Sequence, residues 1–148
     1  VRLKVTLSKG FGEEEFTLGS MLCSKEAVCR SVRRFKARVN VLETSRLLTA
    51  GFSCMLHVHC IATMCSWDKV IGVIDKKSGK SRPLPFVKGG QTCDIQVEMP
   101  ELFCLEIYKT YPQLGRFVMR EDGATVGIGV VTSFDCDQDC ARDGDSSE

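Results

Sequence analysis

The chain has 148 residues, enough for one domain with a sizeable core, or for one domain and part of another. Hydrophobic residues make up 43% and charged residues 26%, a composition typical of folded globular proteins and unlike that of a disordered chain. No apolar run reaches the roughly 18–20 residues that cross a bilayer, so we expect no membrane as a partner.

The net charge of +1 hides an uneven distribution. The last fourteen residues, "DCDQDCARDGDSSE", hold six acids and one base, so residues 1–134 carry 19 bases and 13 acids, a formal +6. A mild positive charge on residues 1–134 suits binding to RNA or to an acidic protein, but it is equally typical of an ordinary solvated surface. The acidic tail, residues 135–148, is expected to be disordered.

The nine cysteines form no secreted disulfide pattern, because their number is odd and no signal peptide is visible. The start "VRLKVTLSKG" has no initiator Met and alternates like a strand, so we expect the chain to begin inside a larger protein. Several cysteines lie in apolar strand patterns, where a thiol behaves as a small hydrophobe. We therefore expect free thiols and a reducing, cytoplasmic location.

Period-two alternation dominates the chain and predicts strands with one buried face. In "FKARVNVLE", Phe35, Ala37, Val39 and Val41 share one side. The predicted strands are residues 1–7, 35–43, 52–60, 68–74, 92–99, 102–108, 115–121 and 125–134. Loops rich in Gly, Pro, Asp and Ser separate them, and residues 24–34 are interpreted as a linker.

Strand signals every 10–15 residues favour an all-β sandwich or closed barrel over alternating βα units. The segment of residues 13–34 is typical of the end of one unit and the crossing into the next. We therefore place a boundary near Arg33. The prediction is the end of a preceding β domain with its linker over 1–33, a main domain over 34–134, and the tail over 135–148.

Nucleotide-binding motifs are missing from the sequence, which contains no G-x-x-x-x-G-K-[ST]. The glycines of "GATVGIG", Gly123 to Gly129, are followed by no helix that would present amides to a phosphate. They are better explained by a tightly packed strand, where small residues allow a close backbone approach.

The stretch "MLHVHCIATMC" places two histidines and two cysteines within nine residues, which raises the question of a metal site. On a continuous strand, His57 and His59 point to one face and Cys60 to the other, which divides the possible ligands. Cys54 also falls opposite His57, so a catalytic thiol–imidazole pair is disfavoured. We predict no metal ligands and no catalytic residues in this chain.

The segment "GRFVMRE", residues 115–121, is a candidate partner surface. Arg116, Val118 and Arg120 share one face of the predicted strand, and Phe117 and Met119 share the other. An exposed apolar or basic pair often marks a partner surface. Periodicity alone favours Phe117 and Met119 in the core and ordinary solvated arginines.

The main domain resembles the C-terminal β-barrel of the translational GTPases of the elongation factor one-alpha type. The matching pieces, in order, are "FKARV", "GFSCMLHVH", "DKKSGK", "FVKGGQ", "CLEIYKTYPQLGRFVMR" and "TVGIGVV". Within that family it looks most like the eukaryotic class-II peptide-chain release factors. The ribosome-rescue GTPases that partner Pelota are a near second.

The resemblance implies a six-stranded Greek-key closed barrel, preceded by the C-terminal part of a second β-barrel domain. It implies that GTP and magnesium bind an N-terminal domain that this chain does not contain. In the release factors, a "GRFTLRD"-like motif in the last hairpin is tied to binding the class-I factor, which reads stop codons. Carried over, it assigns partner binding to Gly115, Arg116, Phe117, Val118, Met119, Arg120 and Glu121.

The resulting hypothesis is a binding module of a translation termination GTPase, monomeric, and reaching the ribosome through the full complex. We expect no direct DNA binding and no enzymatic activity in this chain. The alternatives left open are the rescue GTPase, and elongation factor one-alpha carrying aminoacyl-tRNA. A metal or thiol enzyme built on the His/Cys stretch is the alternative from a different class.

Overall fold

The computed structural model describes residues 4, 6, 10, 12, 17–42, 46–76 and 78–134. Within them the chain forms only β structure: β1 (Ser31–Val41), β2 (Leu48–Thr49), β3 (Ser53–Val58), β4 (Ile61–Ile74), β5 (Ser81–Arg82), β6 (Phe86–Val87), β7 (Thr92–Cys104), β8 (Arg116–Glu121) and β9 (Ala124–Phe134). That part of the chain contains no helix of the length and apolarity needed to cross a bilayer.

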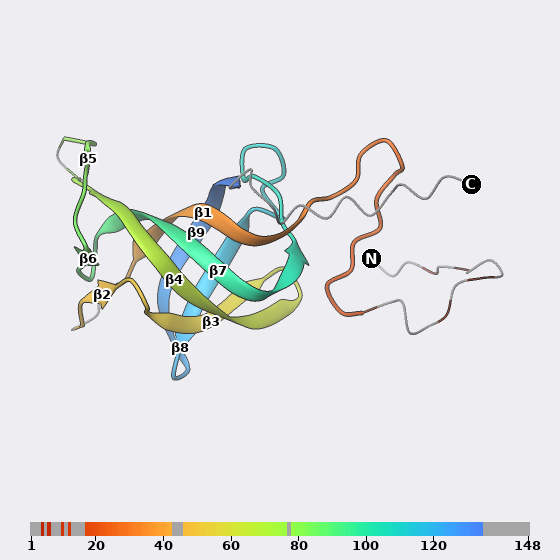
Figure 1. The fold of residues 1–148 in the computed structure, drawn as a ribbon, viewed down its shortest axis with the longest axis horizontal. Coiled ribbons are helices and arrows are strands. Elements are labelled where there is room, and N and C mark those ends of the chain that lie inside the picture. Colours follow the sequence, from red (N-terminus) through yellow and green to blue (C-terminus); the bar gives the residue numbers. More distant parts are fainter. Residues whose placement is uncertain are drawn as a thin grey trace.

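Six long strands form a closed antiparallel barrel in the order β3-β8-β9-β1-β7-β4, and a β3–β4 pairing completes the ring (Figure 1). The first strand, β1, lies between β7 and β9, while β3, β4 and β7 follow one another around the wall. That arrangement is a Greek key. The predicted all-β, six-stranded barrel is thus confirmed.

The predicted alternation of β1 is also confirmed. Phe35, Ala37, Val39 and Val41 are all buried, while the residues between them face outward. The core continues with the other large buried side chains: Trp67, Phe117, Leu56, Ile95, Met99, Leu105 and Met119. Closure gives each of the six barrel strands two hydrogen-bonded neighbours. The alternation between core and surface is interrupted in β4, where its register with β7 shifts.

Two strands predicted separately, 92–99 and 102–108, are one strand, β7, which passes through Pro100 and ends at Cys104. The register with β1 shifts at this point, from Arg34↔Glu98 to Val32↔Phe103. A proline has no N–H to give to a ladder, and a bulge tolerates that loss. Arg33 donates to the carbonyl oxygens of Met99 at 3.2 Å and Pro100 at 2.5 Å.

Other predicted boundaries differ from the structure by smaller amounts. The predicted linker 24–34 ends earlier, because β1 begins at Ser31. Two predicted loops, 44–51 and 75–85, contain the short strands β2 and β5. The predicted strand 1–7 and the acidic tail 135–148 lie outside the described residues, apart from Lys4 and Thr6.

Close packing of the last hairpin depends on two glycines. A Cβ at Gly129 would lie 2.4 Å from the Phe117 ring, and one at Gly127 would lie 3.0 Å from Val39. The Phe117 ring also meets Phe35 edge-on, with 5.6 Å between ring centroids. The interpretation of "GATVGIG" as a closely packed strand is therefore confirmed.

Phe117→Ala should lower the free energy of unfolding by about 3–5 kcal/mol, because it leaves a cavity between Phe35 and Gly129. Val118→Ala, on the outer face of the same strand, should cost less than about 1 kcal/mol. Urea denaturation followed by far-ultraviolet circular dichroism measures both. Equal losses for the two variants would contradict the assignment of Phe117 to the core.

Candidate functional site

Strand β8 divides the predicted motif 115–121 between the core and the surface. Phe117 and Met119 are buried, with 2% and 0% of their surfaces exposed. Arg116 and Arg120 are exposed, and Val118 is half-buried on the same outer face. The structure therefore leaves only part of the motif accessible on the outer face, while Phe117 and Met119 pack in the core.

Gly115 holds the entry to β8 against a neighbouring loop. A Cβ here would lie 2.5 Å from both the N and Cα atoms of Tyr108 and 2.7 Å from the carbonyl oxygen of Glu106. The Gly115 carbonyl accepts a hydrogen bond from Val131 N at 2.7 Å, and Tyr108 N donates to the Val131 carbonyl at 3.0 Å. Only glycine permits this approach, so Gly115 positions the strand without offering a side chain.

The last two residues of the motif are held by local bonds. A guanidinium nitrogen of Arg120 donates to the carbonyl oxygen of Gly123 across the hairpin turn, at 2.7 Å. The Glu121 carboxylate forms an ion pair with Arg46 from the loop before β2. These contacts fix the far end of the hairpin.

The side chain of Arg116, at the other end of β8, has no hydrogen bond or ion pair with any described residue. It is therefore available to a ligand.

Side chains from three strands complete the outer surface beside Arg116. His57 on β3 is in register with Val118, and Val118 is in register with Ile128 on β9. Ile128 is 51% exposed, and together with the half-buried Val118 it gives this outer face an apolar pair. The row therefore forms a continuous strip with an apolar centre, next to a cation.

A hollow of about 330 Å³ opens over this strip. Three lining residues belong to the strip, namely His57, Val118 and Ile128, and the others are Arg116, His59, Gln113 and Phe117. The described lining contains no carboxylate. We call this feature the β8 hollow.

The turn between β3 and β4 corrects the prediction for the His/Cys stretch. β3 ends at Val58, so His59 and Cys60 form a two-residue turn, with His59 at φ 38°. The turn brings the Cys60 thiol to 3.6 Å from His59 Nδ1, although strand alternation had placed these side chains on opposite faces. Among the described residues, no three His, Cys, Asp or Glu side chains are grouped to hold a metal ion.

His59 is held in a defined tautomer by its neighbours. Its Nε2 lies 3.2 Å from the carbonyl oxygen of Cys104, and a carbonyl only accepts, so Nε2 carries the proton. Nδ1 is then the acceptor that faces the Cys60 thiol. The imidazole ring of His57, in contrast, makes no hydrogen bond with a described residue, although its backbone belongs to β3. The two histidines therefore have different roles: His59 ties the turn to β7, and His57 presents its ring to the hollow.

The buried cysteines are free thiols that pack as small hydrophobes. Cys54 and Cys65 face each other across β3 and β4, with 3.6 Å between their sulfur atoms. Their mutual hydrogen bond lowers the pKa of Cys54, whereas the same bond, together with burial, raises the pKa of Cys65. Burial, followed by the charge of the adjacent Asp94, raises the pKa of the Cys93 thiol to about 12.

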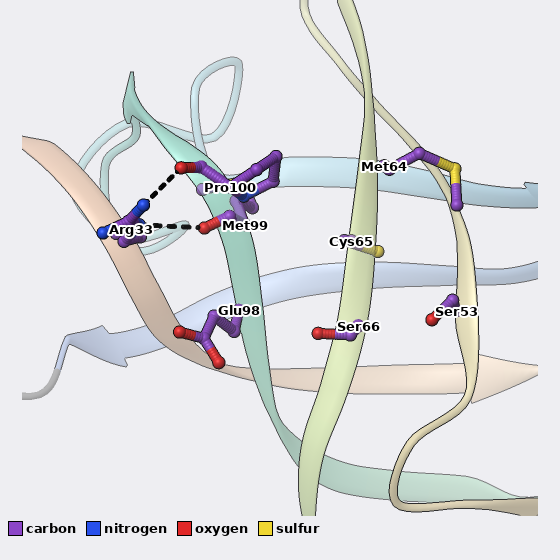
Figure 2. Close-up of a pocket in the computed structure, with 8 residues that line it drawn as sticks. All are labelled: Arg33, Ser53, Met64, Cys65, Ser66, Glu98, Met99 and Pro100. Carbon is purple, nitrogen blue, oxygen red and sulfur yellow. Dashed lines mark hydrogen bonds between the residues drawn. The ribbon is translucent and has the colours of Figure 1, made fainter.

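A second hollow, of about 290 Å³, lies on the opposite side of β3, against β4 and β7. Figure 2 shows Arg33 turned toward the carbonyl groups of Met99 and Pro100. Its guanidinium donates hydrogen bonds to both carbonyl oxygens, which belong to β7. The Glu98 carboxylate accepts from Arg34 at 2.9 Å. Both charged groups of this hollow are occupied, so we favour the β8 hollow as the functional site.

Comparison with known proteins shows the family to which this barrel belongs. The profile of the family described as GTP-eEF1A C-terminal domain-like matches residues 34–132. The chain belongs to this family. The match covers all six barrel strands, apart from the first residues of β1 and the last two of β9.

Two relatives are called eukaryotic peptide chain release factor GTP-binding subunit. The one from Candida albicans is 36% identical over 136 residues, and the one from Kluyveromyces lactis is 35% identical over the same length. In each case the match covers 90% of this chain but only 19% of the relative. The chain thus spans about a fifth of the length of the release-factor subunits that it resembles.

A solved structure described as Sup35 complexed with GDP has a similar fold. It superimposes with a TM-score of 0.77 at 28% identity, over 84% of this chain and 31% of the other. A second structure, Sup35 complexed with GMPPNP, gives a TM-score of 0.69 over 75% of this chain. The barrel found here thus recurs in a GTP-binding member of the family.

Reasoning from the sequence missed the contribution of β3 and β9 to the site. The sequence alone presents His57 as a candidate metal ligand or catalytic base, and Ile128 as part of a glycine-rich strand. The sequence contains one signal for this contribution, which is the position of Ile128 between two glycines that face the core. Strand alternation places a residue at such a position on the outer face.

The high pKa of Cys93 predicts a loss of stability in alkali. The folded state holds this proton more tightly than the unfolded chain, whose thiol has a pKa of 9.0. The stabilising contribution is therefore complete below about pH 9 and is lost as the pH rises toward 12. The loss should approach about 1.4 kcal/mol per pH unit in the upper part of this range.

Cys93→Val should reduce the slope of unfolding free energy against pH, measured by urea denaturation between pH 8 and 10.5. Cys60→Ser, at an exposed thiol, is the matched control and should keep the wild-type slope. An unchanged slope in Cys93→Val would show that this thiol does not control the alkaline transition.

Proposed function

We propose that this chain is the partner-binding barrel of a translation termination GTPase, and that it binds the class-I release factor through the outer face of β8. The observation that carries the proposal is the 36% identity to a release-factor GTP-binding subunit, which extends over 90% of the chain. The exposed Arg116 beside the apolar pair Val118 and Ile128 supplies a surface suited to a protein partner.

The role of the barrel in this proposal is to dock the partner, and the chemistry belongs to another part of the protein. GTP and magnesium would bind in an N-terminal domain outside this chain, as the names of the relatives and the absence of a phosphate-binding motif here suggest. Hydrolysis there would control when the docked factor is released on the ribosome. We place this activity in the cytoplasm, with a monomeric chain.

The burial and contacts of residues 115–121 support a different role for each part of the motif in this proposal. Arg116 and Val118 would contact the partner directly. Phe117 and Met119 would act from the core by holding β8 in its position in the barrel wall. Gly115 would act by allowing the backbone of Tyr108 to approach β8 closely. Arg120 and Glu121 would hold the hairpin turn and form the rim of the interface.

Arg116→Ala should weaken binding of the class-I release factor about tenfold, since an exposed arginine near an apolar centre is a frequent hot spot. Arg120→Ala should weaken it less, because that guanidinium is already bonded to Gly123 O. Isothermal titration of the purified 148-residue chain measures both. Arg82→Ala, at an exposed position on β5, is the control for loss of a surface charge.

Undiminished binding by both arginine variants, with the fold intact by circular dichroism, would remove the arginines from the proposal. Parallel titrations with Pelota and with aminoacyl-tRNA test the partner itself. A clear preference for Pelota would favour the rescue GTPase. Binding to aminoacyl-tRNA that falls steeply with salt would favour the elongation factor.

A further inference from the structure

The β8 hollow has an apolar floor and a rim of hydrogen-bond donors. Its floor is formed by Val118 and Ile128, and its rim includes Arg116, His57 and the amide of Gln113. Phe117 also belongs to the lining, but its side chain is buried in the core. The floor suits an aliphatic side chain, and the rim suits a group that only accepts hydrogen bonds. A ligand that satisfies both has an apolar part and an anionic part close together.

No ion pair joins Arg116 to a described acid. Glu106, whose backbone lies beside Gly115, accepts a hydrogen bond from Arg30 N at 3.2 Å, and two acids farther along the sheet are paired with other arginines. Asp94 forms a two-point ion pair with Arg38, with N–O distances of 2.8 and 3.1 Å. Glu121 pairs with Arg46 at the far end of the hairpin. An arginine beside an apolar floor, with no acid of its own, is a ready site for an external carboxylate.

We propose that the β8 hollow binds an aliphatic side chain of the protein partner together with an adjacent Asp or Glu carboxylate, and that Arg116 and His57 hold this carboxylate. The proposal rests on the proposed function and specifies the chemistry that the partner must present. It also adds His57 and Ile128, from β3 and β9, to the binding residues. His59 is excluded as a donor, since both of its ring nitrogens already have partners.

The same observations disfavour a nucleic acid as the occupant. A phosphate backbone is bound by a row of cations, each near one phosphate. Among the described residues that line the hollow, Arg116 is the only Lys or Arg, and Arg38 on β1 is paired with Asp94. The half-exposed Ile128 would gain nothing from a phosphate, whereas burial against a protein side chain removes its apolar surface from water.

Isothermal titration of the 148-residue chain with the class-I release factor tests the hollow. Ile128→Ala and Arg116→Gln should each weaken binding about tenfold, and His57→Ala about threefold. Arg116→Lys should restore little of the loss, because an ammonium lacks the planar fork that matches a carboxylate. Matched controls are Ile71→Ala, an exposed isoleucine on β4, and Arg82→Gln on β5. Both controls should bind like the wild type.

The carboxylate is located by a double-mutant cycle. Each surface Asp or Glu of the release factor is changed in turn to Asn or Gln, and each variant is titrated against wild-type chain and Arg116→Gln. One position should weaken binding to the wild type about tenfold but binding to Arg116→Gln less than about twofold. Thermal unfolding of every chain variant confirms that it is folded before titration.

The outcomes separate the two proposals. A wild-type chain that does not bind the release factor overturns the proposed function, and this inference with it. Normal binding by the wild type, with hollow variants that match Ile71→Ala and Arg82→Gln, overturns the inference alone. Weakened hollow variants without any coupled acidic position in the partner overturn the assignment of a carboxylate.

Discussion

The Phe117 ring, packed edge-on against Phe35 and over the bare backbone of Gly129, fixes the position of β8 in the barrel wall. The contact joins three strands, because Phe35 belongs to β1, Phe117 to β8 and Gly129 to β9. Interiors are packed too densely to accommodate a side chain at Gly129 without moving the ring. Since alternate residues of a strand point in opposite directions, burying Phe117 and Met119 turns Arg116 and Val118 to the surface.

This coupling means that both faces of the motif would contribute to the proposed complex. In that proposal, a substitution at Phe117 would loosen the strand that carries the surface, and a substitution at Arg116 would remove a contact. Gly115 acts in a third way, through the close approach of the Tyr108 backbone. Stability and binding therefore have to be measured separately for every position of 115–121.

The conformation of the β3–β4 turn decides which side chains of the His/Cys stretch lie close to one another. With β3 ending at Val58, the positive φ of His59 sends the chain back into β4 and brings the Cys60 thiol to the imidazole. The same turn ties His59 to the Cys104 carbonyl at the end of β7. His57, two residues earlier, is left on the outer face, where it lines the β8 hollow.

The sequence by itself determined the all-β character, the buried face of β1 and the core positions of Phe117 and Met119, because period-two alternation follows directly from strand geometry. It also indicated the partner motif, through resemblance to a known family. The continuity of β7 through Pro100 and the turn at His59 depended on bulge and turn conformations that alternation does not encode. Only the closed barrel could place His57, Val118 and Ile128 side by side, since they come from three strands whose order around the wall differs from their order in the chain.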